Sequence, residues 1–350
     1  MVRFMIFKYL FHCFVFALLL FSTPSLSAVI LQYHHVSEKL PAVTSVSEET
    51  FKTHLIYLKE NDFNVIHLDK LLHHTQQGKA LPAKTVAITF DDGYDNNIEQ
   101  AAPILEAFGY PYTIFVNPQL IDENKSYVMT WDELRALAKR GALIANHSAK
   151  HDYLHLKQDG ETQAQWLKRV REDILFSEKR IEEEVGYNVK LLAYPYGEFN
   201  RPLQNLVKEI GFIGIGQHSG AVSEFTDYTR VPRYPASGFY SKLDTLKTKL
   251  HSLPFAISEL DYTDSVTSNP TPTIEIEFIG KDFYQSQFAC FVSGVGRADI
   301  AWKNEKRVSV TSPEDIKKGR TRYNCTAPSI KHPGQFYWFS QPWVLQASDE

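Results

Sequence analysis

The chain has 350 residues, of which 43% are hydrophobic, and this length suits one large domain and one small one. Its formal net charge is −4 at pH 7, so the balance of charges gives no support to a nucleic-acid partner.

The first 27 residues have the pattern of a signal peptide. Arg3 and Lys8 form a basic start, residues 11–21 are largely apolar, and residues 25–27 (Ser-Leu-Ser) offer a small-residue cleavage site. The apolar stretch is short and ends at a Pro-Ser break, which favours cleavage over an uncleaved membrane anchor. We therefore expect export to the periplasm, the cell surface or the medium.

Strand and helix patterns alternate from about residue 29 to residue 250. The expected strands are 29–33, 86–90, 112–116, 142–145, 190–194 and 211–215. The expected helices are 48–61, 98–108, one opened by the capping box at 130–133, and 161–185. This alternation predicts a parallel sheet, here a distorted (β/α) barrel over residues 28–262. In such barrels the catalytic groups lie at the carboxyl ends of the strands.

Two polar motifs follow apolar runs that read as buried strands. Asp91 and Asp92 come directly after one run, and His147 and His151 come after another. An Asp-Asp-Gly alone is most often a turn, and a His-x-x-x-His alone is common on solvated helix faces. Histidines at i and i+4 would share one face of a helical turn. With one of the aspartates they make a His-His-carboxylate set that suits a divalent metal and leaves a position open for water.

A third motif, Pro195-Tyr196-Gly197, again follows a strand pattern. The stretch 89–93 (Thr-Phe-Asp-Asp-Gly), the two histidines and this turn together resemble the NodB-type polysaccharide deacetylases, carbohydrate esterase family four. The resemblance covers roughly residues 29–262 and is closest to the PgaB and IcaB branch, which N-deacetylates poly-β-1,6-N-acetylglucosamine. Further likeness to that branch lies in residues 33–35 (Tyr-His-His), 50–72 and 231–233 (Val-Pro-Arg).

The resemblance implies a division of labour between the two carboxylates. Asp92, His147 and His151 would hold the metal, and Asp91 would take the proton from the attacking water. A carboxylate bound to a cation differs from a free one, so adjacent residues can serve different roles. Zinc is the default metal for this ligand set, and cobalt, nickel or iron would also fit.

The Pro-Tyr-Gly turn would stabilise the oxyanion that forms during the reaction. By the resemblance, the backbone N–H of Tyr196 lies near the developing negative charge and is held rigid by Pro195 and Gly197. Tyr194, just before the turn, is expected with these residues to contact the substrate.

A general acid and a cation that orients the base are also needed. His34 is the candidate acid, with a hydrogen-bonded structural histidine as the alternative, and His35 and His218 are weaker candidates. Most of the family has an arginine two residues before the proline of the turn, where this chain has Ala193. The PgaB-like branch suggests that Arg233 supplies that charge from another strand.

The pattern changes after residue 262. Residues 263–272 have a linker composition, and short strands are expected near 273–278, 288–292, 298–302, 308–310, 322–325 and 335–339. They predict a small β-sandwich over residues 273–350. Its aromatic side chains are expected to form the sandwich core, with stacking on sugar as the alternative. In residues 337–339 (Tyr-Trp-Phe) neighbours face opposite sides, so one ring should pack on the barrel or on glycan.

Two cysteines remain beyond the signal peptide, Cys290 and Cys325. In an exported chain an even pair predicts a disulfide, here within the C-terminal region, and two buried free thiols are the alternative. Neither lies near the metal motifs in sequence.

The sequence thus predicts an exported, metal-dependent N-deacetylase of an N-acetylglucosamine polymer at the cell envelope. Peptidoglycan or chitin-type substrates are alternatives, and the same chemistry would cleave acetyl esters. A non-catalytic glycan-binding protein on the same fold is the hypothesis from another class. Exopolysaccharide export machinery is the expected protein partner.

Overall fold

The structure is a computed structural model that describes residues 27–346. The expected signal peptide lies outside the described residues, apart from Ser27. Within residues 27–346, every helix is too short or too polar to cross a membrane.

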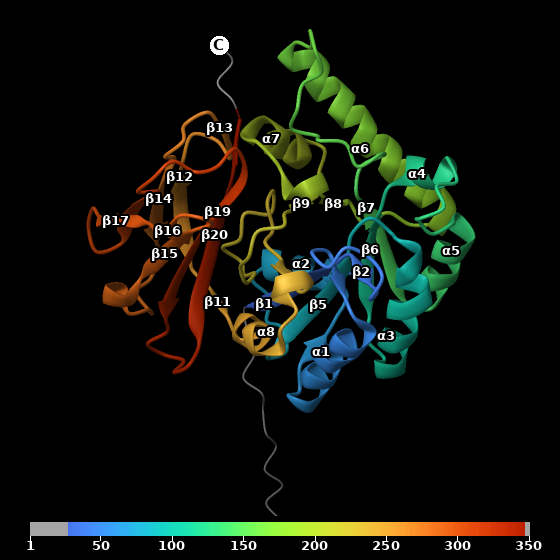
Figure 1. Ribbon diagram of the computed structural model, residues 1–350, viewed down its shortest axis with the longest axis horizontal. Coiled ribbons are helices and arrows are strands. Elements are labelled where there is room, and N and C mark those ends of the chain that lie inside the picture. The colour runs from blue at the N-terminus through green and yellow to red at the C-terminus, as the bar shows by residue number, and fades with distance from the viewer. Residues whose placement is uncertain (1–26, 347–350) are drawn as a thin grey trace, which may run out of the picture.

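The first part of the chain forms the expected parallel sheet, which curls into a distorted barrel (Figure 1). Its strands, in pairing order, are β10 (Tyr234–Pro235), β1 (Ala28–Tyr33), β5 (Thr85–Phe90), β6 (Tyr112–Val116), β7 (Ala142–Asn146), β8 (Leu191–Ala193) and β9 (Ile213–Ile215), and β4 (Asn64–Val65) also pairs with β5. Residues 231–234 connect the two ends of this strand order. Val231 bridges to Ile215 in β9, and Tyr234 pairs with Leu31 in β1. The barrel prediction is confirmed.

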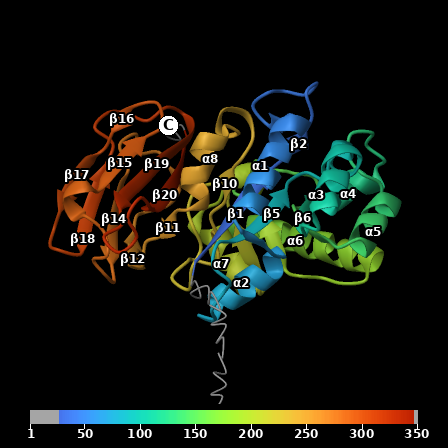
Figure 2. The same cartoon turned by 90° about the horizontal axis from the view of Figure 1, so that it is seen from below.

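Helices cover the outside of the barrel, and α3 to α6 lie on the side away from the C-terminal strands (Figures 1 and 2). The helices are α1 (Glu48–Glu60), α2 (Leu68–Gln76), α3 (Ala102–Phe108), α4 (Pro118–Asp122), α5 (Trp131–Lys139), α6 (Gln163–Val185), α7 (Arg201–Glu209) and α8 (Leu243–Leu250), with short helical turns η1 (Asn97–Ala101), η2 (Pro195–Gly197) and η3 (Gly238–Tyr240). The expected capping box of Thr130 and Glu133 opens α5. Between β1 and α1, the two-residue strands β2 (His35–Val36) and β3 (Ser45–Val46) pair with each other.

Alternation along the strands separates two buried layers. In β1, Val29 and Leu31 pack with the apolar face of α1, whereas Ala28 and Ile30 belong to the cluster that fills the barrel. The same alternation in β5 places Ala87 in the inner cluster. Positions 89 and 91, and 32 in β1, therefore continue the inner row toward the carboxyl ends of the strands.

The C-terminal part is a sandwich of two sheets beside the barrel (Figures 1 and 2). One sheet has the order β11 (Leu253–Pro254), β20 (Phe336–Leu345), β19 (Gly319–Pro328), β15 (Ala289–Val292), β16 (Gly296–Arg297), with β13 (Val266–Thr267) also on β20. The other has the order β12 (Ile257–Asp261), β14 (Thr273–Phe278), β18 (Arg307–Thr311), β17 (Asp299–Trp302), and η4 (Gln285–Gln287) is a short turn. A core of aromatic and aliphatic side chains fills the space between the sheets.

The sandwich begins earlier than the sequence suggested. β11 and β12 precede residue 262 yet pair within the two sandwich sheets, and β13 lies inside the expected linker 263–272. Short edge strands tolerate the Ser, Thr, Asn and Pro composition that reads as a linker. We propose that the boundary between barrel and sandwich lies near residue 252.

Aromatic side chains mostly form the sandwich core, as expected. Tyr337 and Phe339 pack against that core, whereas Trp338 lies edge-on to Tyr234 of the barrel, with ring centroids 5.6 Å apart. The Nε1–H of Trp338 donates to Ser340 Oγ. The expected outward ring therefore packs on the barrel.

The disulfide is confirmed, since Cys290 and Cys325 are bonded partners on the neighbouring strands β15 and β19. Closing a loop across a sequence separation of 35 residues should stabilise the fold by about 3–4 kcal/mol. We expect the double variant Cys290→Ala/Cys325→Ala to lose about that much free energy of unfolding in urea titrations. Reduction of the wild-type protein should give a similar loss, and an unchanged midpoint in both would contradict this account.

Candidate active site

Asp91 and Asp92 diverge at the carboxyl end of β5. Asp91 continues the inner row of the strand and is fully buried in the barrel mouth. Asp92 adopts a left-handed backbone with φ of 72°, and Gly93 follows with φ of 64°. A Cβ on Gly93 would lie 2.9 Å from a side-chain atom of Val116, so only glycine fits this turn. The turn directs the two adjacent carboxylates to different places.

The expected helical turn at the two histidines is wrong. β7 ends at Asn146, and residues 147–151 form a loop in which Ser148 and His151 have φ of 66° and 65°. Asn117 Nδ2 donates to the carbonyls of His147 and Ser148 at 2.6 and 3.1 Å, and Asn146 Oδ1 accepts from the Ser148 N–H at 2.9 Å. These side chains take the place of the backbone hydrogen bonds of a helix.

This loop nevertheless brings both imidazoles to Asp92. Asp92 Oδ1 lies 3.3 Å from His147 Nε2 and 3.2 Å from His151 Nε2, and one ligand atom from each residue fits within 4.8 Å of the others. Two ligands on a tetrahedral zinc with bonds of about 2.0–2.1 Å are separated by about 3.3 Å. The spacing therefore fits a small divalent metal.

A buried nitrogen without a partner supports the same assignment. His147 Nδ1–H donates to the Ala193 carbonyl at 2.8 Å, which fixes the tautomer and leaves Nε2 as the free donor atom. That Nε2 is buried and has no hydrogen-bond partner among the described residues. A metal ion would satisfy it, and the carbonyl of β8 orients the ring as in other histidine metal sites.

The protonation states of the three ligands also fit a metal. Burial acts to raise the pKa of Asp92, but the adjacent His147 outweighs it and holds the pKa well below its usual range. Burial and the charge of His147 lower the pKa of His151 to about 4, so its imidazole is neutral at pH 7. Burial opposes a charge on His147, but the nearby Asp92 and Asp91 raise its pKa overall. A metal ion would replace that proton.

Arg233 holds Asp91 with two parallel hydrogen bonds. Its Nη1 and Nη2 donate to Asp91 Oδ1 and Oδ2 at 2.7 and 2.8 Å, and both side chains are fully buried. Gln32 Nε2 adds a bond of 2.7 Å to Oδ2. Burial alone would raise the pKa of Asp91, but the guanidinium charge outweighs it and brings the pKa to about 2. The structure thus pairs the buried Asp91 with the guanidinium of Arg233.

Of the three candidate histidines, His34 is the one beside Asp91. His34 Nε2 lies 3.9 Å from Asp91 Oδ2, and its side chain is 19% exposed at the mouth of the site. His35 stacks on Tyr94 at 3.8 Å between ring centroids and bonds to Asn96. His218 is buried, and burial followed by the charge of Arg230 puts its pKa far below the usual value, which favours a neutral imidazole.

The Pro-Tyr-Gly turn η2 lies next to His151. Tyr196 is left-handed with φ of 61°, and its ring stacks on Tyr153 at 4.0 Å and meets His151 at 4.4 Å between centroids. Tyr194 is fully buried and its hydroxyl donates to the Thr229 carbonyl at 2.8 Å. The side chain of Tyr194 therefore packs in the protein interior, and a contact of this residue with substrate stays a prediction.

Several supporting residues were missed. Gln32 could have been predicted from the sequence, because it is a polar side chain near the end of an otherwise apolar strand. Asn117 and Tyr153 carried none, since their roles depend on contacts between segments far apart in the sequence.

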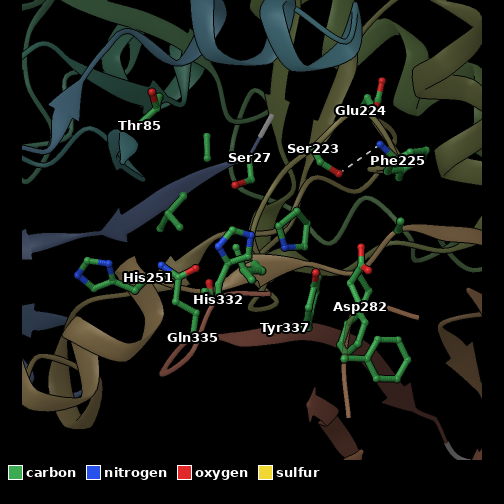
Figure 3. A pocket seen from close by; sticks show the side chains of 18 of the residues that line it. Ser27, Thr85, Ser223, Glu224, Phe225, His251, Asp282, His332, Gln335 and Tyr337 are labelled. Atoms are coloured by element: carbon green, nitrogen blue, oxygen red, sulfur yellow. Dashed lines mark hydrogen bonds between the residues drawn. The ribbon is translucent and has the colours of Figure 1, made fainter. Parts of the chain in front are cut away.

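A separate cavity of about 570 Å³ lies between barrel and sandwich (Figure 3). It includes Ala28 and Thr85, the first residues of β1 and β5, so it opens at the amino ends of the strands. Tyr337 and Asp282 line it from the sandwich. The residues that line it do not include Asp91, Asp92, His147 or His151, which lie at the opposite end of the strands.

Comparisons with known proteins show what the chain is similar to. Residues 78–215 match the family model described as polysaccharide deacetylase. The poly-beta-1,6-N-acetyl-D-glucosamine N-deacetylase of Staphylococcus aureus (strain MSSA476) is 26% identical over 227 residues, which are 59% of this chain and 78% of that protein. The protein of the same name from Escherichia coli (strain K12) is 24% identical over 221 residues, 53% of this chain but only 33% of that protein.

Among solved structures, IcaB from Ammonifex degensii superimposes with a TM-score of 0.55 and 19% identity, covering 65% of this chain and 98% of that one. At this identity the likeness shows the fold. The barrel is thus similar in fold to the deacetylase barrels among these structures. Residues 78–215 are therefore similar to the polysaccharide deacetylases.

Proposed function

We propose that this protein is an exported, metal-dependent N-deacetylase of N-acetylglucosamine residues in an exopolysaccharide of the poly-β-1,6 type. The observation that carries the proposal is a buried, ionised Asp91 paired with Arg233, beside a separate three-residue metal site. The printed names of the S. aureus and E. coli relatives support the substrate class. The model of the family covers neither His34 nor Arg233, so their roles rest on geometry.

The reaction would be hydrolysis of an acetamide to acetate and an amine. Asp92, His147 and His151 would hold a divalent metal, and a metal there would supply a water nucleophile at neutral pH and polarise the carbonyl. Asp91 accepts the proton of the attacking water, and Arg233 keeps that carboxylate ionised and fixed in position.

Two further groups complete the proposed mechanism. The Tyr196 N–H donates to the oxyanion as the new carbon–oxygen bond forms. His34, next to Asp91 and open to solvent, gives a proton to the nitrogen as the carbon–nitrogen bond breaks. With that proton the nitrogen leaves as a neutral amine, which is a far better leaving group than an amide anion.

The location and partner are part of the same proposal. Export follows from the expected signal peptide, and an N-acetylglucosamine polymer at the envelope would be the substrate. Machinery that exports this polymer would be the protein partner.

The test is amine release from three substrates by the protein without its expected signal peptide. We expect release from poly-β-1,6-N-acetylglucosamine oligomers to exceed release from chitin oligomers or peptidoglycan. Preference for either of the others would keep the chemistry and overturn the substrate assignment. Binding of all three without amine release would favour a glycan-binding protein.

His147→Ala should weaken zinc binding more than replacement of a residue that only supports one of the three ligands. Loss of a residue that merely supports a ligand costs about 10–100-fold in affinity, so loss of this ligand should cost at least about 100-fold. Isothermal titration of the metal-stripped protein measures this, with His73→Ala on the exposed face of α2 as the control. Equal zinc affinity in both variants would remove His147 from the metal site.

A further inference from the structure

Strand β19 of the sandwich reaches the proposed oxyanion turn of the barrel. Thr321 and Tyr323 point into the sandwich core, so Arg320 lies on the opposite face of the strand. Its Nη1 donates to the Tyr196 carbonyl at 3.0 Å. A residue of the C-terminal sandwich thus binds the backbone of the turn that adjoins His151.

A second contact of the same arginine lies on the other side of Gly197. Arg320 Nε is 3.5 Å from Glu198 Oε1, and the second oxygen of Glu198 is 3.5 Å from His155 Nδ1. Burial raises the pKa of Glu198, and the charge of Arg320 opposes that shift. Arg320 therefore contacts both residues that flank Gly197.

The turn needs this support because its backbone is unfavourable. Tyr196 and Gly197 are left-handed in succession, with φ of 61° and 69°. Such a conformation in a residue with a Cβ persists only where surrounding contacts hold it. The barrel holds it through the ring of Tyr153 and through Gln217, which lies within 2.5 Å of a Cβ placed on Gly197. Arg320 holds it from the sandwich.

We propose that the active site is shared between the two parts of the chain, with Arg320 of the sandwich as a positioning residue for the Tyr196 turn. This rests on the proposed function, because the turn matters to catalysis only if its N–H serves the oxyanion. The contact is half exposed to solvent, so it contributes little to global stability. The contact should instead affect how well ordered the turn is and the rate of the chemical step.

Hydrogen exchange tests the positioning without any need for activity. The N–H groups of Gly197 and Glu198 donate to the carbonyls of Tyr194 and Pro195. In Arg320→Ala we expect these amides to exchange several-fold faster. Arg297→Ala, on the exposed edge strand β16 of the same sheet, should leave them unchanged. Equal exchange in both variants would overturn the inference.

Steady-state kinetics tests the catalytic consequence. Loss of one oxyanion donor costs about 10²–10³-fold in kcat, so a disordered donor should cost about 10–100-fold, with KM little changed. Arg320→Lys should recover part of the loss, and added guanidinium should partly rescue Arg320→Ala. A raised KM with unchanged kcat would make Arg320 a substrate-binding residue instead, and unchanged kcat with faster exchange would deny the turn a catalytic role. If the wild-type protein releases no amine, the proposed function fails, and hydrogen exchange still decides the positioning.

Discussion

Asp91→Asn should lower kcat for amine release by about 10²–10⁴-fold while zinc remains bound. The amide has nearly the same shape as the carboxylate but cannot accept the proton of the attacking water. Asp91 is bonded to Arg233 and Gln32, and the metal-site geometry involves Asp92, His147 and His151. The metal affinity should therefore change little.

The measurement pairs kcat with zinc stoichiometry in the same preparations. Asp244→Asn, at an exposed carboxylate in the first turn of α8, is the matched control and should behave as wild type. A variant that loses zinc would show that Asp91 is a ligand. A variant that keeps both zinc and activity would show that another group is the base.

Arg233→Met should have the largest effect on stability. It leaves the fully buried Asp91 without its counter-charge, and breaking one partner from a buried pair costs about 3–5 kcal/mol. The pKa of Asp91 is about 2 in the wild type, below its unfolded value near 3.9, so the stabilisation is present above pH 4 and disappears as pH falls toward 2. In the variant, burial raises that pKa, so the stability deficit should be greatest at neutral pH and shrink in acid.

Urea unfolding between pH 3 and pH 7 would measure this deficit in stability. In the pH–rate profile, the fall of activity in acid (the acid limb) should shift to higher pH in the variant. Arg230→Met is the matched control, because Arg230 is also buried but bonds to Tyr262 and Gln341 rather than to a carboxylate. It should lose stability without moving the acid limb. An acid limb that stays in place in Arg233→Met would contradict the role of Arg233.

The sequence was sufficient for the elements that apolar patterns define. Buried strands are continuous apolar runs, so the strands that carry Asp91, His147 and the Pro-Tyr-Gly turn could be found without a structure. Strand alternation then explains why Asp91 and Arg233 meet, since both continue inward-facing rows of the barrel.

The parts that could not be predicted depend on contacts across the chain. The histidine loop is not helical because Asn117, which follows a different strand, satisfies its carbonyls. The sandwich boundary was missed because β11 and β13 are too short to show a period. Arg320 gave no signal at all, because it is an ordinary polar position of a half-buried strand until the barrel lies beside it.

The central claim is that amine release requires one metal ion in the site of Asp92, His147 and His151. The most direct measurement is amine release from poly-β-1,6-N-acetylglucosamine oligomers by metal-stripped protein during titration with zinc. We predict no release without metal and a linear rise that saturates at one equivalent, with Asp91→Asn silent throughout. Release that is independent of metal, or equal release by Asp91→Asn, would contradict the account.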